Sequence, residues 1–300
     1  MDKKIIPLVG NSSFTKEMES IIRSVSATNA SVLLIGERGT GKRLIAQNIH
    51  FFASQNFGYF FEINCRSFSD ENILAAFENV SKIAAFGQRI TLFVASVNLI
   101  LPEIQKHFLN LIKEIRKRGT NLKIICSAEC SLEEKMREGQ FDADLFYQLN
   151  TVVLNVLPLR QRKEDIIPIA EYYFNQFRKK SGYLFEGFSE DAKNLMLNHF
   201  WAGNADELIN AVQKGFIVGQ LPLIKSCDLG IDVEKNVAKN VNEVELSDKS
   251  LKNALDTFKK EYVTKILEEN GWNQTKTAAV LGIQRTYVIR LINELQIRKK

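Results

Sequence analysis

The feature that most constrains this chain is an apolar run that leads directly into a glycine-rich loop. Residues 31–36 read SVLLIG, which is typical of a buried strand, and residues 36–42 read GERGTGK. A helical pattern follows at once, so the motif G-x-x-x-x-G-K lies between a strand and a helix. In that setting, loop N–H groups and the positive end of the helix hold phosphate oxygens. The residues predicted to bind the nucleotide are Gly36, Glu37, Arg38, Gly39, Thr40, Gly41, Lys42 and Arg43.

Strands and helices alternate along the first half of the chain. The strand-like runs are residues 31–36, 60–64, 90–95, 122–127 and 152–157. The helical patterns between them are residues 42–53, 69–85, 102–118 and 131–138. Such alternation is typical of a parallel sheet that is covered by helices on both faces. We therefore predict a five-stranded α/β domain over residues 1–160.

After Pro158 the pattern becomes purely helical, and we predict a helical lid subdomain over residues 161–228. Ser189 and Asn204 are the expected N-caps of its second and third helices. Residues 229–247 are polar and show no clear period, so we interpret them as a linker. The three expected helices are residues 162–180, 189–199 and 205–218.

The remaining segment, residues 248–300, carries the whole net charge of the chain. It holds 11 Lys and Arg against 6 Asp and Glu, whereas the chain has 40 against 35 and a net charge of +5. A basic terminal domain favours an anionic partner, most often nucleic acid. A solvated helical surface would give the same charge, so charge alone leaves both interpretations open.

The same segment contains a helix-turn-helix pattern. Helical stretches at residues 275–281 and 284–295 flank Gly282, which supplies a turn with positive φ. Residues at the start of the second helix of such a motif contact base edges. The alternative is a small helical domain that merely dimerises. The residues predicted to contact DNA are Lys276, Gln284, Arg285, Thr286, Tyr287 and Arg290.

An apolar stripe precedes the helix-turn-helix and ends at Gly271. Its spacing of three and four residues predicts one helix of about twenty residues. We expect this helix to form a homodimer contact, because two DNA-binding domains related by two-fold symmetry match the symmetry of palindromic double-stranded DNA. The stripe consists of Leu251, Leu255, Phe258, Tyr262 and Ile266.

Several classes of protein are excluded by composition. No run approaches the ~20 apolar residues of a membrane helix, and the first residues lack the apolar core of a secretory signal. Four cysteines in 300 residues form neither a disulfide framework nor a zinc spacing. We therefore expect a cytoplasmic protein without a membrane partner or a bound metal.

Taken in order, these motifs resemble the sigma-54-dependent transcriptional activators, bacterial enhancer-binding proteins with an AAA+ core and a Fis-type helix-turn-helix. The resemblance implies an α/β P-loop AAA+ core with a parallel five-stranded sheet, an α-helical lid and an all-α Fis-type domain. Because it begins near Ile6, no receiver or sensor domain is expected before the core. The segments that carry it are residues 8–12, 36–50, 63–65, 141–150, 157–166, 201–210 and 273–297.

Several positions depart from the family pattern. Arg43 follows the loop lysine where the family usually has Glu, and no carboxylate follows the strand at residues 90–95. With 25 residues between Cys65 and Thr91, there is no match to the family's GAFTGA loop for sigma-54. By resemblance, the family's Asp-Glu pair falls on Ala95 and Ser96, its Thr-Asn sensor on Ala128 and Glu129, its trans-acting arginines on Asp142 and Gln148, and its lid arginine on Asp206.

These departures lead us to expect a sequence-specific transcriptional regulator with a degenerate core. The core would bind ATP or ADP weakly, offer a poor site for Mg²⁺ and not hydrolyse the nucleotide. The protein would act at nucleoid DNA in the cytoplasm. One alternative is a regulatory subunit that assembles with an active enhancer-binding relative. Another is a working ATP-dependent sigma-54 activator with displaced catalytic carboxylates, for which Glu103 and Asp144 are candidates.

Overall fold

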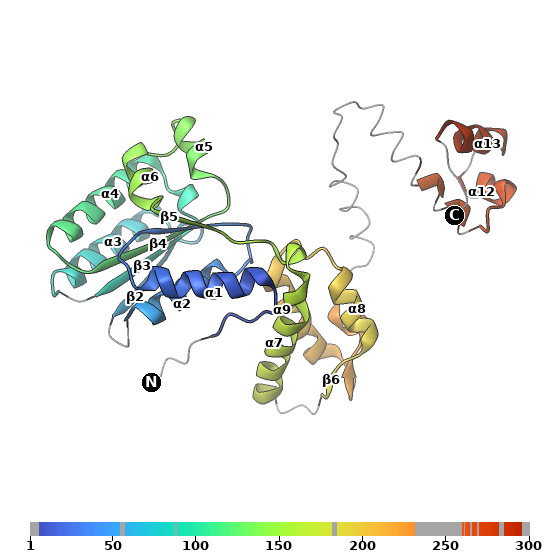
Figure 1. Ribbon diagram of the computed structural model, residues 1–300, viewed down its shortest axis with the longest axis horizontal. Coiled ribbons are helices and arrows are strands. Elements are labelled where there is room, and N and C mark those ends of the chain that lie inside the picture. Colours follow the sequence, from blue (N-terminus) through green and yellow to red (C-terminus); the bar gives the residue numbers. More distant parts are fainter. Residues whose placement is uncertain are drawn as a thin grey trace. The chain divides into compact units, whose positions relative to one another are not determined.

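The computed structural model divides the 300-residue chain into two compact units, Met1–Ile231 and Asp232–Lys300 (Figure 1). The first unit comprises an α/β part and a helical lid, and the described residues of the second unit include the short helices α12 and α13. The predicted linker lies largely outside the described residues, and the predicted domain boundaries remain predictions. The structure describes residues 6–54, 58–87, 89–181, 185–231, 260, 262–264, 266–268, 270–281 and 285–295.

The α/β part is built on one parallel sheet of five strands in the order β2-β3-β4-β1-β5. The predicted sheet is confirmed, and each strand lies within two residues of its expected bounds. Because all strands are parallel, their carboxyl ends meet at one edge, where Ile35 pairs with Ala128 and Asn64 pairs with Ala95. The strands are β1 Val32–Ile35, β2 Tyr59–Asn64, β3 Ile90–Ala95, β4 Leu122–Ala128 and β5 Val152–Asn155.

Helices cover both faces of this sheet (Figure 1). Alternate strand residues face opposite ways, so Leu33 packs with α3 and α4 whereas Val32 and Leu34 pack with α1 and α2. Helix α3 lies between β2 and β3, in the segment where the sequence has no match to a GAFTGA loop. The helices are α1 Ser13–Ser26, α2 Lys42–Ser54, α3 Asp70–Ala84, α4 Pro102–Lys117, α5 Leu132–Arg137 and α6 Ala143–Leu149, with a 3₁₀ turn at Val97–Leu99.

Helix α1 is absent from the sequence predictions. It begins after Ser12, whose hydroxyl oxygen accepts a hydrogen bond from the Thr15 amide at 3.1 Å, as an N-cap residue does. Met18 and Ile22 on the next turns are buried against the sheet. The carboxylate of Asp165 accepts from the Ser12 hydroxyl and the Thr15 hydroxyl, each at 2.7 Å, and so ties the start of α1 to the lid.

The lid packs three helices around a core that includes Trp201, which is fully buried. The expectation of a purely helical lid is wrong, because two short strands pair in parallel, with Gly187 opposite Leu223. Strands of two residues are too short to leave a periodic pattern in the sequence. The elements are 3₁₀ turns at Leu159–Gln161, Lys163–Asp165 and Ser226–Leu229, helices α7 Ile166–Ser181, α8 Glu190–Asn198 and α9 Asn204–Val218, and strands β6 Gly187–Phe188 and β7 Leu223–Ile224.

The second unit contains the expected helix-turn-helix as α12, Gln274–Leu281, and α13, Arg285–Glu294. The residues between these two helices lie outside the described residues. The expected inward-facing Val288 and Leu291 of α13 are buried with Ala278 of α12 and with residues of the preceding helical stretch. In that stretch Ile266 is buried and Tyr262 is half exposed, while Leu251, Leu255 and Phe258 lie outside the described residues.

Candidate functional site

The glycine-rich loop joins β1 to the first turn of α2. Gly39 and Gly41 have φ angles of 76° and 96°, a left-handed conformation that costs glycine little. The ammonium group of Lys42 donates to the carbonyl oxygens of Gly36 at 2.7 Å and Glu37 at 2.6 Å. Burial lowers the pKa of Lys42, and neighbouring carboxylates partly oppose that shift. The loop therefore has the left-handed turns and the lysine that phosphate binding requires.

The lid is tied to this loop through Glu37. The guanidinium group of Arg160 donates to both carboxylate oxygens of Glu37, at 2.8 and 2.6 Å. This bidentate contact is the main cause that lowers the Glu37 pKa. The side-chain amide of Asn204 donates to Glu37 at 3.1 Å and to the Arg38 carbonyl oxygen at 2.8 Å, and its oxygen accepts from the Leu159 amide at 2.7 Å. Loop and lid thus share one polar network, in which Asn204 is fully buried and Glu37 remains partly exposed.

The interpretation of Asn204 as a helix N-cap is wrong. Gly203 is the N-cap residue of α9, and Asn204 itself has a φ angle of 54°. Its side chain is fully buried and satisfies groups of the loop, so it leaves the helix end uncapped. The Ala205 amide donates to the Gly39 carbonyl oxygen at 3.0 Å, which brings the start of α9 onto the loop. Tertiary contacts have replaced the local capping role that Asn usually plays.

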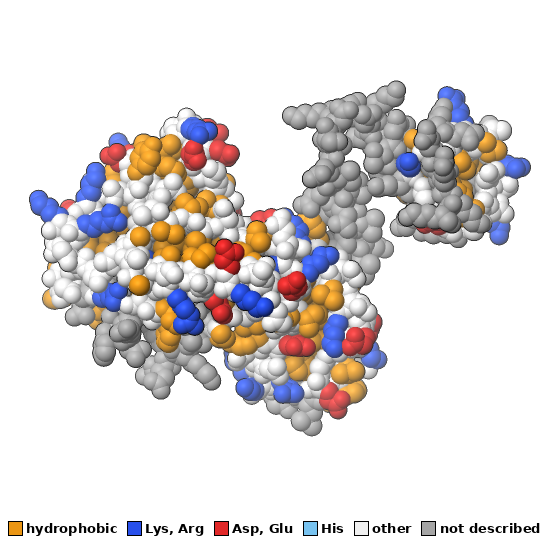
Figure 2. All heavy atoms as spheres, viewed as in Figure 1, with side chains coloured by type: hydrophobic (Ala, Val, Ile, Leu, Met, Phe, Trp, Pro, Cys, Tyr) orange, Lys and Arg blue, Asp and Glu red, His pale blue; other side chains and the backbone are white. Residues whose placement is uncertain are grey.

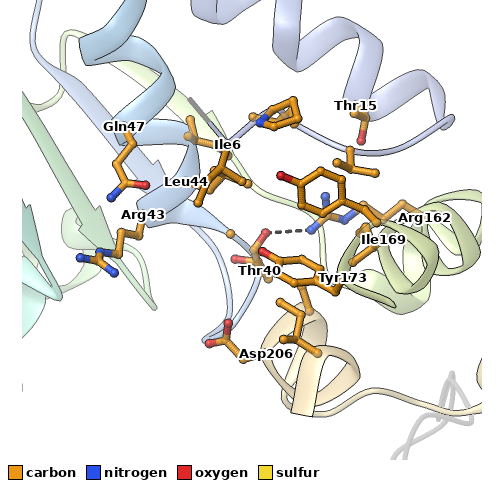
Figure 3. Close-up of a pocket in the computed structure, with 18 of the residues that line it drawn as sticks. Ile6, Thr15, Thr40, Arg43, Leu44, Gln47, Arg162, Ile169, Tyr173 and Asp206 are labelled. Carbon is orange, nitrogen blue, oxygen red and sulfur yellow. Dashed lines mark hydrogen bonds between the residues drawn. The ribbon is translucent and has the colours of Figure 1, made fainter. Parts of the chain in front are cut away.

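A largely apolar cavity of about 240 Å³ opens beside the loop, between α2 and the lid helix α7 (Figure 3). Arg162 lies in its wall, donates to the Thr40 carbonyl oxygen at 2.8 Å and is 8% exposed. Among the described residues, its buried Nε atom has no hydrogen-bond partner. Apolar walls with a few aimed polar groups are the usual lining of a small-molecule site. The apolar and aromatic lining includes Ile6, Leu8, Val9, Leu44, Ile169, Tyr172, Tyr173 and Ile209.

A second, polar cavity of about 360 Å³ lies at the carboxyl edge of the sheet. It shares Gly41, Arg43 and Asp206 with the apolar cavity, so the two spaces adjoin at the loop. Two ion pairs cross it, from Arg43 to Glu62 and from Arg66 to Glu129, each at 2.7 Å. The charged residues that line it are Arg38, Lys42, Arg43, Glu62, Arg66, Glu129 and Asp206.

Some of these residues were not predicted from the sequence. Arg160 and Arg162 fall in a segment quoted for the resemblance, yet nothing local assigned them a role. Glu62 and Arg66 carry no motif, and the signal that could have found them is the pairing of β2 with β3, which brings the end of β2 to the loop. Glu62 and Arg66 therefore line the site because of the order of the strands in the sheet.

Ser96 and Asn98 lie at the end of β3, where the resemblance places the family's acidic pair. Ser96 has a φ angle of 55°, and its amide donates to the Ser127 hydroxyl at 3.2 Å. The side-chain oxygen of Asn98 accepts from the Glu129 amide at 3.3 Å. Both side chains are buried. Asn98 therefore supports the end of β4, and the position of the acidic pair holds neutral groups.

The two carboxylates considered as displaced catalytic groups lie elsewhere. Glu103 is in the first turn of α4, and Asp144 in α6 pairs with Lys113 at 3.8 Å. Neither residue lines the polar cavity or the apolar one. The hypothesis that Glu103 or Asp144 replaces the family's acidic pair gains no support from these positions and stays a prediction.

In the second unit, most of the predicted DNA-contacting residues are exposed. Arg285, Thr286 and Tyr287 form the first turn of α13, with Arg290 on the following turn, and Lys276 projects from α12. Gln284 lies outside the described residues. The Asn273 side chain accepts from the amides of Thr275 and Lys276, at 3.1 and 3.2 Å, and so caps α12. The charged side chains visible on this unit in Figure 2 are mostly basic.

Two further absences hold for the described part of the chain. No three His, Cys, Asp or Glu side chains gather there as a metal site would require. No helix within the described ranges is long and apolar enough to cross a bilayer.

Together, the parallel sheet, glycine-rich loop and helical lid define an AAA+ P-loop module, which this chain joins to a helix-turn-helix unit. Three family profiles match in that order: Sigma-54 interaction domain over residues 8–155, AAA+ ATPase lid domain over residues 160–246, and Bacterial regulatory protein, Fis family, over residues 254–290. The three profiles follow one another in the order expected for the sigma-54-dependent transcriptional activators, so the resemblance to that family is confirmed.

Curated relatives agree with this assignment. Regulatory protein AtoC of Escherichia coli (strain K12) is 30% identical over 91% of this chain and 64% of its own length. Transcriptional regulatory protein ZraR of Klebsiella oxytoca is 28% identical over 93% of this chain and 66% of its own. The Nif-specific regulatory protein of Azotobacter vinelandii is 29% identical over 98% and 59%. The chain thus spans about two thirds or less of the length of these relatives.

Solved structures show the same architecture. NtrX from Brucella abortus in complex with ATP superposes with a TM-score of 0.65 at 26% identity, over 96% of this chain and 69% of that chain. The RuvB branch migration motor of Thermotoga maritima superposes with a TM-score of 0.51 at 14% identity, over 92% and 83%. The second likeness shows the AAA+ fold alone.

Proposed function

We propose that this protein is a DNA-binding transcriptional regulator whose AAA+ core binds a nucleotide without hydrolysing it. The end of β3 carries the proposal, because Ala95 and Ser96 stand where the family has two carboxylates. Such carboxylates hold the metal and help to orient the attacking water. A serine hydroxyl is not a useful base near neutral pH, and the Asn98 side chain already accepts a backbone hydrogen bond.

Nucleotide binding is supported by the loop and by the apolar cavity beside it. The loop presents Lys42 and left-handed glycines, and the cavity adds apolar walls with one buried cation. That cation is Arg162 in the cavity wall, whose guanidinium group donates to the Thr40 carbonyl oxygen. NtrX of Brucella abortus, which has the same fold, is known in complex with ATP. These features favour an adenine nucleotide, ATP or ADP.

DNA binding is supported by the exposed basic and polar side chains at the start of α13. In helix-turn-helix proteins this end of the second helix contacts base edges in the major groove. We expect a homodimer through the helix that precedes Gly271, palindromic double-stranded sites, and action at nucleoid DNA in the cytoplasm. The dimer helix is a sequence prediction, because most of its stripe lies outside the described residues.

Steady-state phosphate release by the full chain tests the absence of hydrolysis. Wild-type protein with ATP and Mg²⁺ should release phosphate at the background rate, and the Lys42→Ala variant should be indistinguishable from it. A wild-type rate clearly above that of Lys42→Ala would contradict the proposal.

A second candidate is a regulatory subunit that joins rings of an active relative. At the positions of the family's trans-acting arginines, Asp142 caps α6 by accepting from the Leu145 amide at 2.8 Å, and Gln148 accepts from Arg116. This chain would therefore supply no arginine to a neighbour's nucleotide, and mixed rings would lose turnover at that interface.

A genome-wide map of DNA bound by the tagged protein separates the two candidates. Sites over core promoters that share one palindrome would support direct regulation. Sites upstream of sigma-54 promoters that are shared with an active relative would support the mixed ring. An absence of enriched sites would contradict both, because each requires the helix-turn-helix to bind DNA.

A further inference from the structure

The polar cavity does not suit the Mg²⁺ ion that the family's chemistry implies. Mg²⁺ binds carboxylate, hydroxyl and water oxygens in a near-octahedral shell. Here Arg43 follows the loop lysine, and the end of β3 contributes no carboxylate. Among the described residues, no three His, Cys, Asp or Glu side chains are grouped closely enough to hold a metal. The residues of the cavity therefore do not fit the metal.

Two of the three carboxylates that line the cavity, Glu62 and Glu129, are already occupied by guanidinium groups; the third is Asp206. Glu62 pairs with Arg43, through Nη2 at 2.7 Å and Nε at 2.9 Å. Glu129 pairs with Arg66 at 2.7 Å. A metal ion would have to displace an arginine from each carboxylate and then lie beside both displaced positive charges. Coulomb repulsion opposes that arrangement at these short distances.

A phosphate chain fits the same cavity better than a metal does. A guanidinium group binds phosphate with the planar, two-pronged geometry that it uses for carboxylate. The side chains of Arg43 and Arg66 are 66% and 41% exposed, so an incoming phosphate oxygen can reach both. They extend from different elements, the first turn of α2 and the segment after β2, and so lie on different walls of the cavity with Lys42.

We propose that this cavity binds the phosphates of an adenine nucleotide without a divalent metal, with Arg43 and Arg66 supplying the positive charge that a metal would bring. The proposal rests on the proposed function in taking a nucleotide as the ligand. Phosphate oxygens replace Glu62 and Glu129 as partners of the two arginines, so each ion pair holds an arginine in place until the nucleotide arrives. The buried Arg162 then faces the rest of the nucleotide in the apolar cavity.

Calorimetric titration of the full chain with ADP tests this directly, once in excess EDTA and once in MgCl₂. The dissociation constant should differ by less than about twofold between the two buffers. Arg43→Met and Arg66→Met should each weaken binding in EDTA by about tenfold, the usual effect of losing a charge-assisted hydrogen bond. Arg137→Met removes an exposed ion pair on α5 and serves as the control.

One further variant separates a binding role from a structural one. Glu129→Gln removes the competing partner of Arg66, so it should tighten ADP binding in EDTA by about threefold. A structural role for the ion pair would instead give weaker binding or a lower melting temperature. Unchanged melting of Arg43→Met and Arg66→Met would show that their loss of affinity is local.

Two results would overturn the inference. ADP binding that tightens tenfold or more with Mg²⁺ would show that the metal is required. The absence of ADP binding in both buffers would show that an adenine nucleotide is not the ligand of this cavity. Neither result touches the DNA-binding part of the proposed function, which the genome-wide map tests separately.

Discussion

Single residues decide which nucleotide this site favours. Glu129 and Asp206 both act on Lys42, the residue that reaches the β- and γ-phosphates in a P-loop. Both carboxylates lie close enough to Lys42 to act on its charge, and a terminal phosphate bound there would bring further negative charge beside them. A triphosphate therefore meets more repulsion than a diphosphate does, and we expect the cavity to favour ADP over ATP.

The variant Asp206→Asn tests this preference. Removing one charge near the terminal phosphate should raise the affinity for ATP relative to ADP by about fivefold, or about 1 kcal/mol. Calorimetric titration of both nucleotides in EDTA measures the ratio. Asp144→Asn, which changes an exposed carboxylate on α6, should leave the ratio as it is. An equal response to both nucleotides in Asp206→Asn would rule out a charge effect at the terminal phosphate.

Arg285 is one of the residues that we predict to contact bases. It is exposed in the first turn of α13, and arginine pairs bidentately with guanine. Arg285→Ala should weaken binding to the native site by roughly 1–3 kcal/mol and relax specificity at one base pair. Fluorescence anisotropy with native and single-substituted sites measures both effects. Arg137→Ala in the first unit is the control, and unchanged affinity of Arg285→Ala would remove this residue from the interface.

At the scale of elements, a buried lysine joins β4 to the end of α1. The ammonium group of Lys123 donates to the carbonyl oxygens of Val25, Thr28 and Ala30, at 2.9, 3.0 and 2.8 Å. Val25 lies in the last turn of α1, and Thr28 and Ala30 lie in the segment that connects α1 to β1. The Lys123 side chain is buried, with 2% exposure. A positive charge at a helix C-terminus also complements the helix dipole.

Lys123→Met should therefore destabilise the first unit by about 1–3 kcal/mol, because buried carbonyl groups lose their donor. Urea unfolding followed by circular dichroism measures the change. Lys113→Met, at a lysine with an exposed ion pair, should cost little. Equal stability of the two variants would contradict the assigned role of Lys123.

The same lysine gives a pH dependence. Burial lowers the Lys123 pKa from 10.5 to about 8, and Arg89 adds to the shift. Between those values the folded state binds fewer protons than the unfolded state, so stability rises with pH from about 8 to 10.5. Below pH 8 both states carry the proton and this contribution is constant. The rise should be present in wild type and absent in Lys123→Met.

At the scale of the whole molecule, the chain carries an AAA+ core and a helix-turn-helix in two separate compact units. If the predicted helix before Gly271 pairs two copies, the DNA-binding form is a dimer. Leu255→Asp on the apolar stripe should then convert dimer to monomer in sedimentation velocity and weaken binding to a full palindrome. Asn253→Asp, off the stripe, is the matched control. A wild-type monomer on a single half-site would contradict the dimer.

Local patterns in the sequence determined most of the architecture. The strand that leads into Gly36, the alternation of strands and helices, and the two helices α12 and α13 each depend on periodicity or on backbone preferences over a few residues. Those signals predicted the sheet, the helical lid and the helix-turn-helix. They also predicted too little: α1 carries apolar residues at helical spacing, Phe14, Met18, Ile22 and Val25, yet was missed, as were the two-residue strands β6 and β7.

Only the tertiary structure decided how the candidate site is completed. The strand order β2-β3-β4-β1-β5 brings Glu62 and Arg66 to the loop, and the lid brings Asn204 to Glu37 across 167 positions. No local pattern encodes such pairs, because they depend on which elements become neighbours once the apolar faces are buried. The sequence therefore determined that the chain carries a glycine-rich phosphate-loop motif and that uncharged residues follow β3, and the packing of strands and lid decided which charges surround the loop.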